Sequence, residues 1–191
     1  MFPLNLPNLL TVLRIMLVPV LVVALLGNTP EGDVLAAVVF ALASLTDFID
    51  GYLARARDSV TTFGKLMDPL ADKLLIIAAL ISLVSLHRLP AWVAMVIITR
   101  ELAVTMLRMG ATQVGVVMEA SMFGKVKTCL QIAAILALIA VHGQPLWVSA
   151  LLYLAVIVTV LSGLDYFFGV RRLMAKAEAQ RHARAERSAE R

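Results

Sequence analysis

Six long apolar segments divide this 191-residue chain, and they constrain its fold more than any other feature. Each can cross the hydrocarbon core of a bilayer, roughly 30 Å thick, with about 20 helical residues. Turn-forming stretches such as GNTPEGD, HRLP and HGQP separate them. A spanning segment must satisfy its own backbone in lipid, which a lone strand cannot do. We therefore expect an all-α integral membrane protein with six transmembrane helices. The segments are Leu9–Leu26, Val34–Ala54, Phe63–Leu86, Pro90–Met109, Ala120–Val141 and Leu146–Val170.

Composition excludes a soluble domain. Hydrophobic residues make up 61% of the chain, more apolar surface than a small soluble fold can bury. The single cysteine, Cys129, excludes an intramolecular disulfide framework.

The distribution of positive charge predicts the orientation. With both termini in the cytoplasm, the outside loops lie near residues 28–33, 87–90 and 142–145. Of the 17 Lys and Arg residues, one, Arg88, falls in these loops. We expect residues 1–170 to form a membrane catalytic domain and residues 171–191 a basic, helix-prone cytoplasmic tail. The tail is either a solvated helix or a surface helix that contacts anionic lipid.

Four aspartates interrupt the second and third apolar segments: Asp47, Asp50, Asp68 and Asp72. Counted from the outer face at 1.5 Å per residue, both pairs lie about 20 Å deep. The spacings i, i+3 and i, i+4 place each pair on one face of its helix. Such residues within a membrane usually mark a functional site.

Clustered carboxylates repel each other unless some protonate or a cation binds. Because the donors are all oxygen, with no His or Cys nearby, Mg²⁺ or Mn²⁺ suits them better than zinc. Two pairs suggest two ions, an arrangement that stabilises displacement at phosphorus. The alternative is that the aspartates are helix caps and ion-pair partners of Arg55, Arg57 and Lys65.

The same residues resemble a family signature. The pattern Asp47-x2-Asp50-Gly51-x2-Ala54-Arg55-x8-Gly64-x3-Asp68-x3-Asp72 is similar to that of the CDP-alcohol phosphatidyltransferases. The resemblance implies six transmembrane helices, a homodimer, a cytoplasm-facing active site, a CDP-linked lipid donor and an alcohol acceptor. It implies that all four aspartates bind metal and that Asp72 is also the general base.

The resemblance further implies contacts with the CDP-lipid. The expected residues are Asn8, Thr11, Asp47, Gly51, Ala54, Arg55, Thr61 and Gly64. Asn8 is equally plausible as a plain helix N-cap.

Four other stretches, NLPNLLTVLRI, TRELAVTMLR, GKVKT and LSGLDY, are similar to the bacterial branch of the family that joins CDP-diacylglycerol to glycerol 3-phosphate. This implies a multi-pass protein of the bacterial inner membrane. A phosphorylated acceptor needs cationic partners. The expected ones are Arg100, Arg108, Lys125 and Lys127. Each could also reflect the ordinary positive-inside bias, and Arg100 could simply pair with Glu101.

Three alternatives remain open from the sequence. The same chemistry could use another alcohol, such as inositol phosphate or serine. A divalent-cation transporter would also place carboxylates in helices, although usually near the midplane. A membrane scaffold is the third, and four buried carboxylates argue against it.

Overall fold

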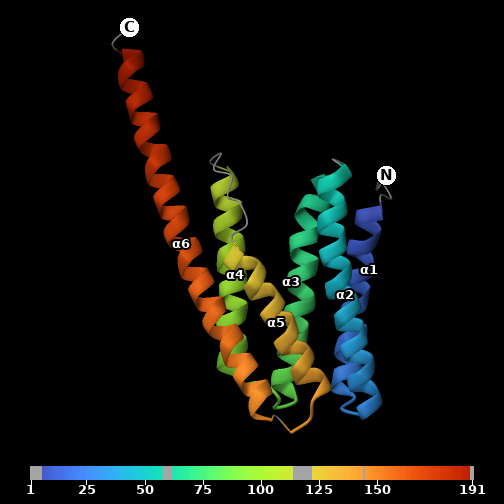
Figure 1. The fold of residues 1–191 in the computed structure, drawn as a ribbon. Coiled ribbons are helices and arrows are strands. Elements are labelled where there is room, and N and C mark those ends of the chain that lie inside the picture. The colour runs from blue at the N-terminus through green and yellow to red at the C-terminus, as the bar shows by residue number, and fades with distance from the viewer. Residues whose placement is uncertain (1–5, 58–61, 114–121, 144, 190–191) are drawn as a thin grey trace.

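The computed structural model describes all of the chain except residues 1–5, 58–61, 114–121, 144 and 190–191 (Figure 1). The described residues form six helices and no strand, which confirms the expected all-α, six-helix architecture. The helices are α1 (Leu6–Leu26), α2 (Pro30–Arg57), α3 (Thr62–Ser85), α4 (Ala91–Gln113), α5 (Met122–Ala140) and α6 (Leu146–Ala189).

Local sequence explains the sharp turn between α1 and α2. Pro30 occupies the first position of α2, where its missing N–H is no loss. The Thr29 hydroxyl accepts a hydrogen bond from the Gly32 backbone N–H at 3.1 Å, as an N-cap does. Asn28 has a φ of 49°, a left-handed conformation that asparagine tolerates better than most residues. The breaker residues therefore end one helix and begin the next within a few positions.

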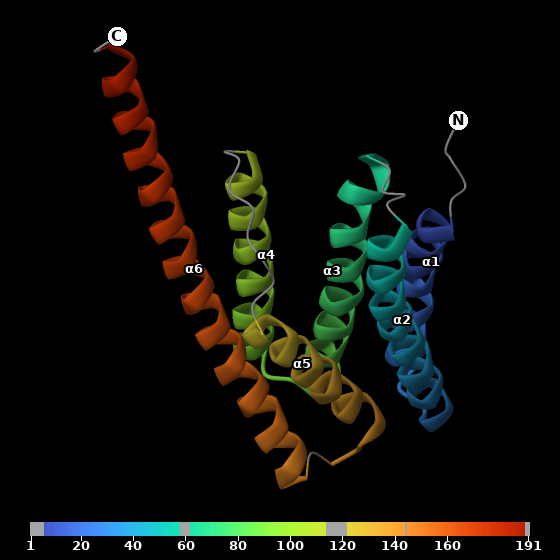
Figure 2. The same ribbon diagram turned by 45° about the horizontal axis from the view of Figure 1, so that its top comes forward.

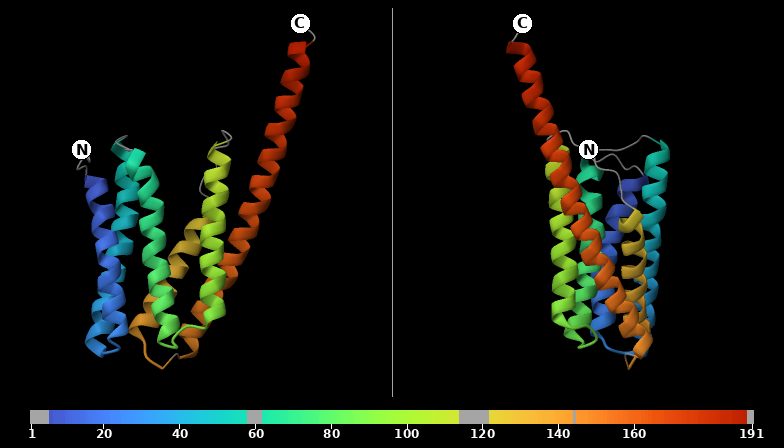
Figure 3. Two further views of the ribbon diagram at one scale, coloured as in Figure 1. Left: turned by 180° about the vertical axis from the view of Figure 1, so that it is seen from behind. Right: turned by 60° about the vertical axis from the view of Figure 1, so that its left-hand side comes forward.

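The helices alternate in direction, so both termini lie at one end of the bundle (Figure 3). Helix α1 packs against α2 and α3, while α6 packs against α4 and α5. Helix α5 also packs against α2 and links the two groups. The amino-terminal ends of α1 and α3 and the carboxyl-terminal ends of α2 and α4 therefore share the end that carries the termini (Figure 1).

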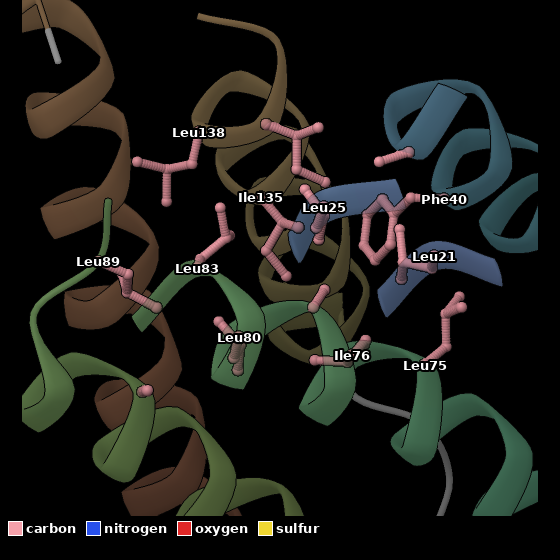
Figure 4. Close-up of a cluster of buried hydrophobic side chains, with 14 of the residues drawn as sticks. Leu21, Leu25, Phe40, Leu75, Ile76, Leu80, Leu83, Leu89, Ile135 and Leu138 are labelled. Atoms are coloured by element: carbon pink, nitrogen blue, oxygen red, sulfur yellow. The ribbon is translucent and has the colours of Figure 1, made fainter. Parts of the chain in front are cut away.

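Apolar side chains fill the space between the helices. Leu21, Leu25, Phe40, Leu80 and Ile135 are among the fully buried ones, and Figure 4 shows them converging from α1, α2, α3 and α5. Large apolar side chains also cover the outside of the bundle, for example on α1, α4 and α6. Among the described residues, one helix is long and apolar enough to cross a membrane, Leu146–Leu173, and shorter apolar helices occupy Thr11–Leu26 and Lys73–Ser85.

At the end of the bundle away from the termini, a cluster of polar side chains connects the α1–α2, α3–α4 and α5–α6 loops. Arg88 donates to Asp33 Oδ2 at 2.8 Å and to Asn28 Oδ1 at 2.9 Å. His142 Nε2 lies 2.7 Å from the same Asp33 oxygen. The α1–α2, α3–α4 and α5–α6 connections thus meet at the buried Asp33 carboxylate.

Helix α6 continues well past its apolar part. Its 44 residues span about 66 Å at 1.5 Å per residue, and its carboxyl end extends beyond the other helices (Figure 2). The helix-prone tail is therefore helical through Ala189, continuous with α6. The division of the chain at residue 170 stays a prediction.

Candidate active site

The four aspartates lie in adjacent helices. Asp47 and Asp50 belong to α2, and Asp68 and Asp72 belong to α3. Both pairs therefore have the helical spacing that the sequence predicted. Their side chains fall outside the described residues, so their roles as metal ligands and base stay predictions.

The residues expected to hold the CDP-lipid are spread over three helices. Asn8 lies in α1, Gly51, Ala54 and Arg55 lie in α2, and Gly64 lies in α3, all with side chains outside the described part. Thr61 falls in the undescribed stretch 58–61.

Thr11 is described, and its side chain is buried in α1. Arg14 follows one turn later on the same face and is only 2% exposed. A buried arginine beside a predicted nucleotide contact is a feature that sequence reasoning did not assign to the site. Its signal was the position of a charge inside an apolar segment.

Glu101 lies in the middle of α4, at the centre of a buried cluster of charges. It is 2% exposed and contacts cations from three helices. Lys73 Nζ of α3 lies 2.6 Å from Glu101 Oε2, and Arg100 Nη1 lies 3.3 Å from Oε1. Lys127 Nζ of α5 also pairs with Oε1. The alternative considered for Arg100, a pair with Glu101, is therefore present, and Lys127 shares the same carboxylate.

This cluster includes Lys73 of α3, the helix that contains Asp68 and Asp72. Lys73 directly follows Asp72 in α3, so the Glu101 carboxylate is linked to the helical turn that carries the predicted base. The connection could not be read from the sequence, because Lys73 and Glu101 are far apart along the chain.

The four cations expected to bind the acceptor fall into two groups. Arg108 and Lys125 have exposed side chains, whereas Lys127 is buried and Arg100 is largely so, with 14% of its side chain exposed. In the described part of the chain, Arg100 and Lys127 contact the Glu101 carboxylate.

Helix α6 supports both arginines of α4. Arg100 Nη2 donates to Ser162 Oγ at 2.7 Å. Arg108 Nε donates to the Tyr166 hydroxyl at 3.4 Å, and its guanidinium carbon lies 5.8 Å from the centre of the Tyr166 ring. Neither Ser162 nor Tyr166 was singled out as a site residue from the sequence.

The arrangement defines the class of protein. A set of cations, suited to a phosphorylated ligand, adjoins helices whose sequence contains four aspartates at metal-binding spacing. The chain matches the CDP-alcohol phosphatidyltransferase family over residues 4–161, and it belongs to that family.

Several members of the family are similar to this chain over most of its length. The chain is 43% identical to a CDP-diacylglycerol–glycerol-3-phosphate 3-phosphatidyltransferase of Bacillus subtilis, over 85% of this chain and 93% of the relative. It is 44% identical to a probable phosphatidylglycerophosphate synthase of Mycobacterium tuberculosis, over 85% and 79%. A 3-phosphatidyltransferase of Rickettsia felis is 39% identical, over 85% and 93%.

Proposed function

We propose that this chain is a CDP-diacylglycerol–glycerol-3-phosphate 3-phosphatidyltransferase. It transfers the phosphatidyl group of CDP-diacylglycerol to glycerol 3-phosphate and yields phosphatidylglycerophosphate and CMP. The observation that supports it most is the cation set of α4 and α5, linked through Glu101 and Lys73 to the helix that contains Asp68 and Asp72. The similarity to relatives of that activity over most of the chain supports the same function.

The acceptor phosphate binds the exposed cations. Arg108 offers a planar fork of N–H donors to phosphate oxygens, and Lys125 supplies a mobile point charge. Arg100 and Lys127 line the inner side of this site and stay in place because Glu101 holds them. Glycerol 3-phosphate is thus placed with its phosphate among cations and its free hydroxyl groups toward α3.

Asp72 acts as the general base in this mechanism. The acceptor hydroxyl is a poor nucleophile while it holds its proton, so a carboxylate oxygen that takes the proton assists its attack. The hydroxyl oxygen forms a bond to the phosphorus that bears the diacylglycerol, the bond from that phosphorus to the bridging oxygen breaks, and CMP leaves.

The aspartate set suits Mg²⁺ or Mn²⁺, and its two pairs suggest two ions. The helical bounds of α2 and α3 give four carboxylates at i, i+3 and i, i+4, an all-oxygen donor set of the kind these ions prefer. Asp47, Asp50, Asp68 and Asp72 would hold them. When bound, the ions would supply positive charge beside the diphosphate and the departing CMP.

The CDP-lipid would bind between α1, α2 and α3. Thr11 is the described member of the set, and its burial against the bundle interior fits a contact with the nucleotide rather than with lipid tails. We assign the remaining contacts to Asn8, Asp47, Gly51, Ala54, Arg55, Thr61 and Gly64.

We place the protein in a bacterial cytoplasmic membrane with six spans, both termini in the cytoplasm, and a homodimeric assembly. The apolar outer surface of the bundle supports a lipid environment, since soluble monomers rarely expose such continuous apolar area. Arg108 lies five residues before the carboxyl end of α4, at the end of the bundle that carries both termini, so the active site would face the cytoplasm.

The proposal is tested by identifying the lipid that the protein makes. Purified protein in detergent receives CDP-diacylglycerol and Mg²⁺ with glycerol 3-phosphate, inositol phosphate, serine or glycerol, and the lipid product is identified by mass spectrometry. The proposal expects phosphatidylglycerophosphate and equimolar CMP with glycerol 3-phosphate only. Transfer to another alcohol would reassign the acceptor, and cation flux without release of CMP would support a transporter instead.

A further inference from the structure

Helix α6 presents a continuous face to the arginines of α4. Ser162 and Tyr166 are one turn apart and lie on the same side of the helix, with Gly163 beside them. A Cβ at Gly163 would lie 3.1 Å from Arg100 Cγ, so the glycine leaves room for the arginine side chain. One face of α6 therefore contacts both Arg100 and Arg108.

The contact with Arg108 is directional. Tyr166 is buried, and its hydroxyl accepts from Nε while its ring lies beneath the guanidinium, within the range of a cation–π contact. The contact with Tyr166 therefore occupies Nε and one face of the Arg108 guanidinium. Among the described residues, no carboxylate forms an ion pair with Arg108. Both Nη groups can therefore form a bidentate contact with phosphate oxygens.

Arg108 follows Arg100 by eight residues in α4, about 12 Å along the helix axis. Without a contact to hold it, the long and flexible Arg108 side chain would sample several rotamers. The Tyr166 contact opposes that movement. Two positive charges held on α4 by contacts with α6 favour the binding of an anion.

We propose that Tyr166 is a positioning residue for the acceptor, because it fixes the orientation of Arg108 and thereby sets the affinity for the phosphate of glycerol 3-phosphate. This inference rests on the proposed function and deepens it by naming a residue that acts on the acceptor through Arg108. The alternative is a purely structural role, in which Tyr166 only packs α6 against α4.

The experiment measures KM for each substrate in three variants of the full-length protein. Tyr166→Phe keeps the ring and removes the hydroxyl, and Tyr166→Leu removes both contacts. Tyr153→Leu is the matched control, because Tyr153 lies on the same helix about 20 Å nearer its start and stacks on Trp92 instead. A fourth protein combines Tyr166→Leu with Arg108→Gln.

We expect Tyr166→Leu to raise KM for glycerol 3-phosphate about 10-fold and Tyr166→Phe about 3-fold, since each removes part of a weak charged contact. KM for CDP-diacylglycerol should stay within about twofold of the wild-type value in both Tyr166 variants, because neither substitution changes a contact proposed for the donor. Tyr153→Leu should leave both constants unchanged. In the Arg108→Gln background, Tyr166→Leu should have almost no further effect, as expected for two residues that act as one unit.

Four results would overturn the inference: an unchanged KM for glycerol 3-phosphate in Tyr166→Leu, an equal rise in both KM values, the same rise in Tyr153→Leu, or the full effect persisting without Arg108. If Tyr166→Leu does not fold, an unchanged KM in Tyr166→Phe overturns it. The wild type tests the proposed function separately, through the acceptor it uses. Should it prefer another phosphorylated alcohol, the same series with that acceptor still tests Tyr166, because the contact serves the phosphate.

Discussion

Lys73 of α3 and Glu101 of α4 form an ion pair with Nζ and Oε2 2.6 Å apart, at a carboxylate that Arg100 and Lys127 also contact. A buried carboxylate with three cationic partners joins α3, α4 and α5 by charge, in addition to the apolar packing between these helices. Removing one member of a buried ionic cluster leaves the others without compensation. The cluster therefore links the stability of the bundle to the positions of Arg100 and Lys127, two of the cations that we propose line the acceptor site.

Glu101→Gln should destabilise the protein by about 3–5 kcal/mol, because up to three cations lose a shared counter-charge in a buried place. The measurement is the thermal unfolding midpoint of the purified protein in detergent. Glu31→Gln is the control, since Glu31 is an exposed acid in the first turn of α2. Equal midpoints for Glu101→Gln and the wild type would show that the cluster contributes little to folding.

Substitution of the exposed Arg108 or Lys125 should change KM, whereas substitution of the buried Lys127 should also change stability. Arg108→Gln and Lys125→Gln should raise KM for glycerol 3-phosphate by the equivalent of about 1.5–3 kcal/mol, the worth of a hydrogen bond to a charged group. KM for CDP-diacylglycerol and the unfolding midpoint should hardly change. Lys127→Met should lower the midpoint as well, because it leaves Glu101 with one partner fewer. A parallel rise in both KM values for Arg108→Gln would point to a general loss of structure.

The sequence predicted the six helices well because breaker residues sit at their ends, as at Asn28–Pro30 and at Pro90. The helices that the sequence predicted also contain the four aspartates and the four cations predicted to bind the acceptor. It named Glu101 as a possible partner of Arg100, and the structure contains that pair. It could not show that Lys73 and Lys127 share Glu101 or that Tyr166 contacts Arg108, because helical periodicity says which face a residue occupies but not which helix that face meets.

Arg88 is a second residue whose contacts could not be predicted from local sequence patterns. In the charge pattern it was the one basic residue on the outer side, an exception without a reason. In the structure it is the partner of the buried Asp33 carboxylate and reaches Asn28 as well. The exception is explained by a contact between segments about 55 residues apart, which no local pattern reveals.

Arg88→Gln should therefore affect stability and not catalysis. The loss of a charged hydrogen bond to a buried carboxylate should cost about 1.5–3 kcal/mol of unfolding free energy. The residue lies at the end of the bundle away from Arg108, so both KM values should match the wild type. A rise in KM for glycerol 3-phosphate without a change in the midpoint would contradict this separation of the two ends.

Metal removal and Asp72 test the predicted roles of the aspartates. EDTA should abolish transfer, and Mg²⁺ or Mn²⁺ should restore it. Asp72→Asn should lower the rate by roughly 10²–10⁴, the usual worth of a general base, while CDP-diacylglycerol still binds in the presence of metal. Asp50→Asn and Asp68→Asn should instead weaken metal and nucleotide binding together. If excess metal returned Asp72→Asn to the wild-type rate, Asp72 would be a ligand only.

Gly163→Ala tests how closely α6 must approach Arg100. The new Cβ would lie 3.1 Å from Arg100 Cγ, so the arginine side chain has to shift by a few tenths of an ångström. We expect the bond from Arg100 to Ser162 to weaken and KM for glycerol 3-phosphate to rise about threefold, a change of roughly 0.7 kcal/mol.

Gly110→Ala is the control for that substitution. It is also a helical glycine, but its added methyl group meets nothing within 4 Å. It should be neutral or stabilising by up to about 1 kcal/mol, because alanine is the better helix former. Steady-state kinetics and thermal unfolding of the two variants separate the effects. The same change in KM for both would mean that helix propensity, and not the position of Arg100, is responsible. A change in Gly163→Ala alone would show that the acceptor site depends on the distance between α4 and α6.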